Sequence, residues 1–142
     1  MNEKRSRMVA TLRAITYATF GALWVTGCGW LALHYCFAPV TEFGPVPHPW
    51  EHKLMLVHGA IAVLSVFLLG WMSSGHIVER WRQGRRLASG IPVSAVGALL
   101  VISGYALYYS IDRTHEVFSA THEAIGVVAI GFALVHWARP FR

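Results

Sequence analysis

Long apolar runs separated by shorter polar segments make up most of the chain. Four such runs contain few charged side chains, and they cover about residues 12–37, 53–74, 91–111 and 118–138. At about 1.5 Å of rise per residue, a helix over each run is long enough to cross a hydrocarbon core of roughly 30 Å. The pattern therefore predicts an all-α fold in which residues 1–142 form a single four-helix transmembrane domain.

The polar connections predict how these helices follow one another. Residues 37–52, FAPVTEFGPVPHPWEH, contain four prolines, which disfavour helix and favour an extended outer loop. The turn SIDRTHEVFS between the last two runs is short, and short turns favour antiparallel neighbouring helices. We therefore expect an integral membrane, up-down-up-down four-helix bundle in which the second and fourth helices run in the same direction.

The composition favours a membrane location. Hydrophobic residues make up 55% of the chain and charged residues only 13%, which is too apolar for a soluble domain of 142 residues. The basic leader MNEKRSR resembles the start of a signal peptide, but the apolar run after it is too long and has no persuasive cleavage site. We expect this first segment to be retained as a spanning helix.

Lysine and arginine are distributed unevenly between the two predicted sides of the membrane. Ten lie near the N-terminus, between the second and third runs, or at the C-terminus. They are Lys4, Arg5, Arg7, Arg13, Arg80, Arg82, Arg85, Arg86, Arg139 and Arg142. Only Lys53 and Arg113 lie on the opposite side, so the positive-inside rule places both termini in the cytoplasm. The net charge of +5 is then explained by topology and by contact with anionic lipids, and no nucleic-acid partner is inferred.

Two predicted helices carry pairs of histidines at helical spacing. His58 and His76 on the second helix are 18 residues apart, and His122 and His136 on the fourth are 14 apart. Because successive residues turn by about 100°, each pair comes within about 40° of whole turns and shares one helix face. Since the two helices run in the same direction, His58 and His122 lie near the outer side, and His76 and His136 lie near the inner side.

These histidines are too far apart to bind one metal ion. A zinc, copper or di-iron centre needs ligands within about 2.0–2.3 Å of the metal, whereas His122 and His136 are separated by roughly 21 Å of helix. Two centres, each held by two histidines, fit better, and haem b leaves two axial positions for them. The chain has no CxxCH motif for covalent c-type haem. The histidines of the second helix are separated by roughly 27 Å, so the outer pair is better matched and a single haem is the fallback.

Glycines on these helices are consistent with a flat cofactor between them. Gly97 and Gly104 are seven residues apart on one face of the third helix. The other three helices carry Gly21, Gly27, Gly29, Gly59, Gly70, Gly126 and Gly131. Small residues also let membrane helices pack closely without a cofactor, and intramembrane histidines also form interhelical hydrogen bonds. A haem-free assembly or transport subunit is therefore one alternative function. A haem oxidoreductase acting on a diffusible substrate such as oxygen or superoxide is another.

Three segments carry a family resemblance: LVHGAIAVLSVFLLGWMSSGHIVERWR, ISGYALYY and THEAIGVVAIGFALVHWARP. With these segments the chain resembles the membrane di-haem cytochrome b superfamily, which includes the four-helix cytochrome b subunits of bacterial formate dehydrogenases and nickel-iron hydrogenases. The chain departs from that family in the 18-residue spacing on the second helix. It also has no histidine at the cytoplasmic end of the first helix, where some members place a ligand.

The resemblance implies that His58, His76, His122 and His136 are axial ligands of two b haems stacked across the bilayer. Electrons would then cross the bacterial inner membrane between a quinone pool and a periplasmic redox protein or c-type cytochrome, with quinone as a further bound cofactor. The chain would be an electron-transfer subunit of a larger respiratory complex rather than a self-contained enzyme, with no catalytic residue of its own.

Four arginines also take a role under this resemblance. Arg13, Arg80, Arg82 and Arg139 lie toward the cytoplasmic side, where guanidinium groups would pair with the propionates of the inner haem. Plain anchoring at the cytoplasmic surface is an equally good interpretation of the same four residues.

Overall fold

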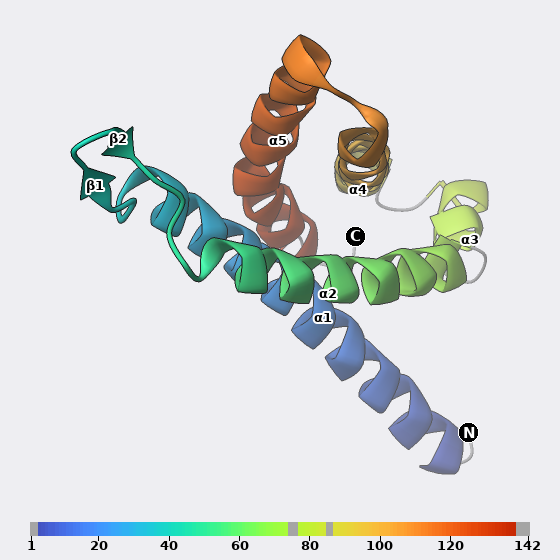
Figure 1. The fold of residues 1–142 in the computed structure, drawn as a ribbon. Coiled ribbons are helices and arrows are strands. Elements are labelled where there is room, and N and C mark those ends of the chain that lie inside the picture. Colours follow the sequence, from blue (N-terminus) through green and yellow to red (C-terminus); the bar gives the residue numbers. More distant parts are fainter. Residues whose placement is uncertain (1–2, 74–76, 85–86, 139–142) are drawn as a thin grey trace. The chain divides into compact units, whose positions relative to one another are not determined.

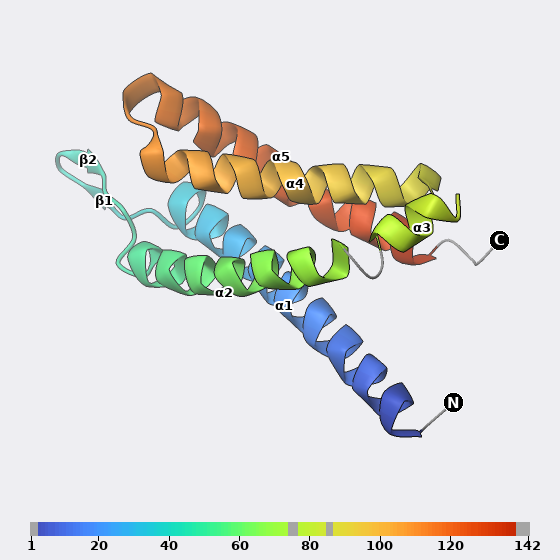
Figure 2. The same ribbon diagram turned by 90° about the vertical axis from the view of Figure 1, so that its right-hand side faces the viewer.

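Helices account for nearly all of the secondary structure in the computed structural model of this chain. The structure describes residues 3–73, 77–84 and 87–138. The chain divides into two units, Met1–Leu69 and Gly70–Arg142, and each is described by itself. Figures 1 and 2 show the ribbon from two directions.

The first unit contains two long helices joined by a loop. Helix α1 covers Glu3–Tyr35 and helix α2 covers Glu51–Met72. Between them, β1 (Val40–Thr41) pairs with β2 (Gly44–Pro45) in a short antiparallel hairpin (Figure 1). Gly44 has a φ of 105°, a left-handed conformation that favours glycine. The loop is not helical, as its prolines predict. The hairpin within it consists of two residue pairs, Val40 with Pro45 and Thr41 with Gly44.

A buried carboxylate ties the end of α1 to the start of α2. Glu51 is only 8% exposed, and its Oε2 lies 3.1 Å from Nδ1 of His34 near the end of α1. Its Oε1 accepts a hydrogen bond of 2.7 Å from the backbone N–H of His48 in the loop. The His34 ring stacks on Trp30, with 4.6 Å between ring centroids. These contacts bring the two helices together at the loop end of the unit.

The second unit is built around an antiparallel pair of helices. The short helix α3 covers Val78–Arg82, α4 covers Leu87–Tyr109 and α5 covers Asp112–Ala138. Helices α4 and α5 run side by side in opposite directions, as Figure 2 shows. Only Ser110 and Ile111 separate them, so the tight connection predicted from the sequence is confirmed.

Three helices begin well before the positions that the apolar runs predict. Helix α1 begins at Glu3 rather than near residue 12. Helix α4 begins at Leu87 rather than near residue 91, which places Pro92 inside the helix instead of near its first turn. Helix α5 begins at Asp112 rather than near residue 118 and includes the polar stretch DRTHE. The predictions counted apolar residues, whereas a helix continues through polar residues wherever backbone hydrogen bonds are satisfied.

Three helices are long and apolar enough to cross a membrane: α2, residues 88–109 of α4, and α5. They present large apolar side chains at their surfaces, such as Val63 and Phe67, which are 74% and 67% exposed. This finding is compatible with a multi-pass membrane protein. Helix α1 contains most of the predicted first span and is 33 residues long. Arg13 and several threonines make it less apolar than the other three, so the fourth span and the four-helix bundle stay predictions.

Candidate functional site

The structure places three of the four predicted ligand histidines. His58 lies on α2 in the first unit, and His122 and His136 lie on α5 in the second. His76 and Arg139 lie outside the described residues. Each of the three described histidines is half-buried.

Two of the predicted propionate-binding arginines have described side chains. Arg13 on α1 and Arg82 at the end of α3 are both exposed. Arg80 also lies on α3. Arg13 belongs to the first unit, and Arg80 and Arg82 belong to the second. Their grouping around one cofactor therefore stays a prediction.

His122 contacts a serine and a glycine that are adjacent in α4. Its Nδ1 lies 2.9 Å from Oγ of Ser103, which is only 5% exposed. A Cβ added at Gly104 would lie 3.2 Å from Cε1 of the same ring. That distance is shorter than ordinary van der Waals contact, so the imidazole fits here because residue 104 has no side chain.

His136 repeats this arrangement fourteen residues further along α5. Its Nδ1 lies 3.2 Å from Oγ of Ser89, and a Cβ at Gly90 would lie 3.9 Å from its Cε1. Ser89 and Ser103 are also fourteen residues apart, on α4. In an antiparallel pair with equal rise on both helices, equal spacings bring the two histidines opposite the two serines.

The first unit contains a third copy of the arrangement. Nδ1 of His58 on α2 lies 3.0 Å from Oγ1 of Thr26 on α1. A Cβ added at Gly27 would lie 3.2 Å from Cε1 of His58. We call each hydroxyl residue with the glycine after it a hydroxyl–glycine seat. The three seats are Thr26–Gly27, Ser89–Gly90 and Ser103–Gly104.

The hydrogen bonds at the seats of His58 and His122 favour one tautomer of each ring. Oγ1 of Thr26 donates to the carbonyl of Ala22 at 2.9 Å, and Oγ of Ser103 donates to the carbonyl of Leu99 at 2.7 Å. A hydroxyl has one proton and a carbonyl oxygen only accepts. The hydroxyl oxygen is therefore the acceptor toward the imidazole, and Nδ1–H is the donor. In this neutral tautomer the lone pair lies on Nε2.

This tautomer fits an axial ligand of a haem iron. Histidines that bind a metal through Nε2 commonly donate Nδ1–H to an oxygen, which also holds the ring in orientation. Among the residues that the structure describes, no three histidine, cysteine, aspartate or glutamate side chains converge as ligands for one ion. A porphyrin needs only one protein ligand on each face, so the spaced single histidines suit haem b.

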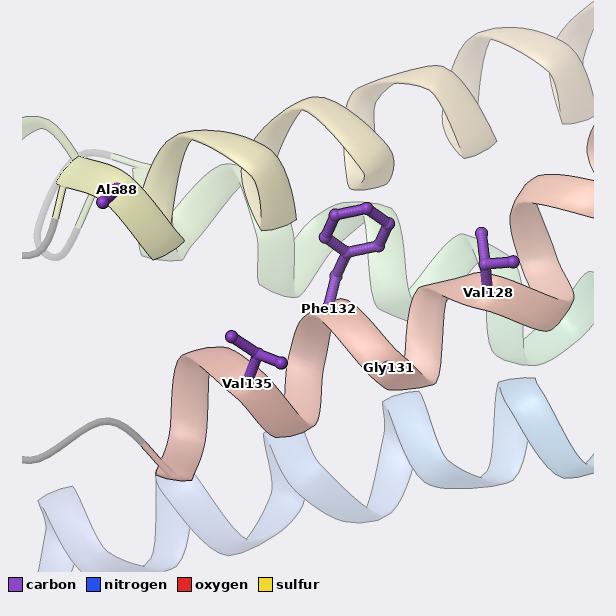
Figure 3. A pocket seen from close by; sticks show the side chains of 5 residues that line it. All are labelled: Ala88, Val128, Gly131, Phe132 and Val135. Carbon is purple, nitrogen blue, oxygen red and sulfur yellow. The ribbon is translucent and has the colours of Figure 1, made fainter.

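An apolar hollow lies on the same pair of helices (Figure 3). It has a volume of about 350 Å³ and is lined by Ala88 of α4 and by Val128, Gly131, Phe132 and Val135 of α5. Ala88 directly precedes the Ser89–Gly90 seat. The hollow therefore provides apolar surface along one face of α5, on residues 128–135.

The hydroxyl residues of the seats are the part of the site that sequence reasoning missed. The dipeptides TG and SG are visible in the sequence, and the two serines repeat at the fourteen-residue spacing of the histidines. Gly27 and Gly104 were expected to give clearance to a flat macrocycle. In the structure they give clearance to the imidazole rings of His58 and His122, and their role toward a macrocycle stays a prediction.

Comparisons with known protein families, curated proteins and solved structures gave no match. The resemblance to the di-haem cytochrome b superfamily therefore stays a prediction. The membrane-compatible helices and the geometry of the seats are the features of this chain that bear on its function.

Proposed function

We propose that this chain is a membrane b-type cytochrome that carries electrons between two bis-histidine haems across the bacterial inner membrane. The observation that carries the proposal is the seat geometry. The same contact recurs at three positions on two helix pairs, and in two of them the hydrogen bonds favour the tautomer with the imidazole lone pair on Nε2. A histidine that only joined two helices by a hydrogen bond could use either ring nitrogen. Such a role would not require the same tautomer at more than one position.

The proposed ligand pairs follow from depth along the helices. His58 and His122 would hold the outer haem. Each has a hydroxyl contact near 3 Å and a glycine at which an added Cβ would lie 3.2 Å from Cε1 of the ring. His76 and His136 would hold the inner haem. A charged or polar group inside a bilayer is costly, and the seats offset that cost by hydrogen-bonding each described imidazole.

The chain's own residues would bind and orient the cofactor. Haem b supplies a one-electron Fe(III)/Fe(II) couple when bound. The histidines would supply axial nitrogens, the seats would hold the rings in one orientation, and apolar side chains such as Phe132 would exclude water. Arg13, Arg80, Arg82 and Arg139 would pair with the propionates of the inner haem at the cytoplasmic side.

The proposed partners are a quinone pool and a periplasmic redox protein or c-type cytochrome. The exposed apolar faces of α2, α4 and α5 suit lipid and neighbouring helices, as expected for a subunit of a larger complex. The redox partner would set the direction of electron flow, because this chain would contribute only two haems at fixed positions and would not itself convert a substrate.

Purified protein is expected to contain two b haems per chain. An absorbance spectrum of the full chain, expressed in haem-replete cells and solubilised in detergent, should show reduced b-type bands. A pyridine haemochrome assay should then give two haems per polypeptide. One haem per chain would reject the two-haem arrangement in favour of a single-haem cytochrome, and a colourless preparation would overturn the proposal.

The proposed topology is tested with the two cysteines. Cys36 is exposed and lies just beyond the end of α1, whereas Cys28 is half-buried within that helix. If both termini are cytoplasmic, Cys36 lies on the periplasmic side. In a Cys28→Ser variant, a membrane-impermeant maleimide added to spheroplasts should label Cys36. A Cys36→Ser variant should remain unlabelled, and protection of Cys36 until lysis would contradict the topology.

A further inference from the structure

We propose that Ser103 and Thr26 are positioning residues that set the ligand strength of His122 and His58 and thereby lower the reduction potential of the haem they bind. The inference rests on the proposed function and extends it to residues outside the ligand set. It concerns the hydroxyl groups, which act through the imidazoles and do not themselves contact the iron.

The hydroxyl of Ser103 is held in place before it meets the histidine. It donates to the carbonyl of Leu99 at 2.7 Å, which leaves its oxygen to accept from Nδ1–H of His122 at 2.9 Å. Ser103 is only 5% exposed, so water has little access to compete for these bonds. The result is a short chain of hydrogen bonds from imidazole to hydroxyl to backbone carbonyl.

Thr26 forms the same chain in the first unit. Its Oγ1 lies 2.9 Å from the carbonyl oxygen of Ala22 and 3.0 Å from that of Leu23, and it is 3.0 Å from Nδ1 of His58. The hydroxyl proton is directed to the backbone, so the imidazole again donates. Thr26 and Ser103 lie far apart in the sequence and on separate helix pairs. Both form the same series of hydrogen bonds, from imidazole to hydroxyl to backbone carbonyl.

Such a chain has an electronic consequence for the ligand. Each hydrogen bond polarises the next in surroundings of low dielectric constant. Donation from Nδ1–H makes the imidazole a stronger base at Nε2. A more basic axial ligand stabilises Fe(III) relative to Fe(II), which lowers the reduction potential. Removing the hydroxyl should therefore weaken haem binding and raise the potential.

The test replaces the hydroxyl while it keeps the histidine and the glycine. Ser103→Ala and Thr26→Val should each lower the affinity for haem by about 10- to 100-fold, the usual effect of losing a hydrogen-bond partner of a metal-bound histidine. In the fraction that retains haem, a potentiometric titration followed by absorbance should show one of the two potentials raised. Ser103→Thr, which keeps a hydroxyl, should restore values close to the wild type.

Two matched controls separate this effect from general packing. Ser65 on α2 is also 5% exposed and donates to the carbonyl of Ile61 at 3.0 Å. Thr16 on α1 donates to the carbonyl of Leu12 at 2.9 Å. Ser65→Ala and Thr16→Val should leave both potentials unchanged. The inference is overturned if the seat variants titrate like the wild type, or if the control variants shift by the same amount.

A second measurement keeps this test independent of the proposed function. Nitrogen-15 NMR of histidine side chains in the detergent-solubilised full chain reports the tautomer directly. His122 should show the Nδ1–H form in the wild type, and its Nδ1 signal should shift in Ser103→Ala, where the backbone hydrogen bond to Leu100 remains. If the wild type binds no haem, the proposed function fails while this experiment still decides the role of the hydroxyl. If haem is bound but Ser103→Ala leaves both the Nδ1 signal of His122 and the two potentials unchanged, the inference alone fails.

Discussion

Replacement of His122 by alanine should remove one of the two haems and leave the other. Under the proposed function this ring would supply a nitrogen ligand to the outer haem, and alanine has no nitrogen donor in its side chain. His58→Ala should remove that same haem, because His58 and His122 are the proposed ligand pair of the outer haem. Each variant is expected to fall from two haems per chain to one in a pyridine haemochrome assay, with the remaining haem titrating at a single potential.

Double variants test whether His58 and His122 share one haem. Because both single changes remove the same centre, His58→Ala combined with His122→Ala should still retain one haem. His122→Ala combined with His136→Ala should retain none, since these residues belong to different centres. His52→Ala is the matched control, because His52 is an exposed residue of α2. Loss of both haems in the first double variant, or unchanged haem content in either single variant, would reject the assignment.

Gly104→Val should cost the outer haem although all four proposed ligands remain. A Cβ at this position would lie 3.2 Å from Cε1 and 3.7 Å from Nδ1 of His122, and valine adds two methyl groups beyond it. The ring would have to move away from Ser103, which breaks the 2.9 Å hydrogen bond. Overpacking of this kind typically costs about 1–3 kcal/mol. Haem content is expected to fall from two per chain to one.

Gly126→Val in the same helix pair is the control for this prediction. A Cβ there would lie 3.9 Å from Cδ2 of Leu100, an ordinary contact distance. Gly27→Val offers a parallel test in the first unit, because a Cβ at Gly27 would lie 3.2 Å from His58. It should remove the same haem as Gly104→Val. Equal haem loss in Gly126→Val, or full haem content in Gly104→Val, would contradict the role given to these glycines.

The positions of the helices followed closely from the sequence, and their ends did not. The apolar runs predict α2 to within about two residues at each end, because α2 begins at Glu51 directly after the proline-rich loop. The start of α5 was placed six residues too late, since the polar stretch from Asp112 to the predicted start at residue 118 is also helical. Backbone hydrogen bonds do not depend on whether a side chain is apolar, so a helix extends beyond the ends of its apolar run.

The histidine faces were visible in the sequence, but the groups opposite them were not. Periodicity is a property of one helix. It predicts that His122 and His136 share one side of α5, but it does not identify the residues that contact them. Which residues oppose them depends on the register between α4 and α5, and that register is set by side-chain packing along both helices. The structure shows that register through the contacts of Ser103 and Ser89.

The sequence by itself determined the apolar helices, the tight turn after α4 and the histidine spacing, because each depends on residues close together in the chain. Tertiary structure decided that hydroxyl–glycine pairs receive the imidazoles at Thr26, Ser89 and Ser103. The physical reason is that the imidazole meets both the hydroxyl, at about 3 Å, and the glycine only in one arrangement of the two helices. That arrangement fixes the axial register and the rotation of each helix against the other. Neither condition is expressed in the periodicity of a single helix.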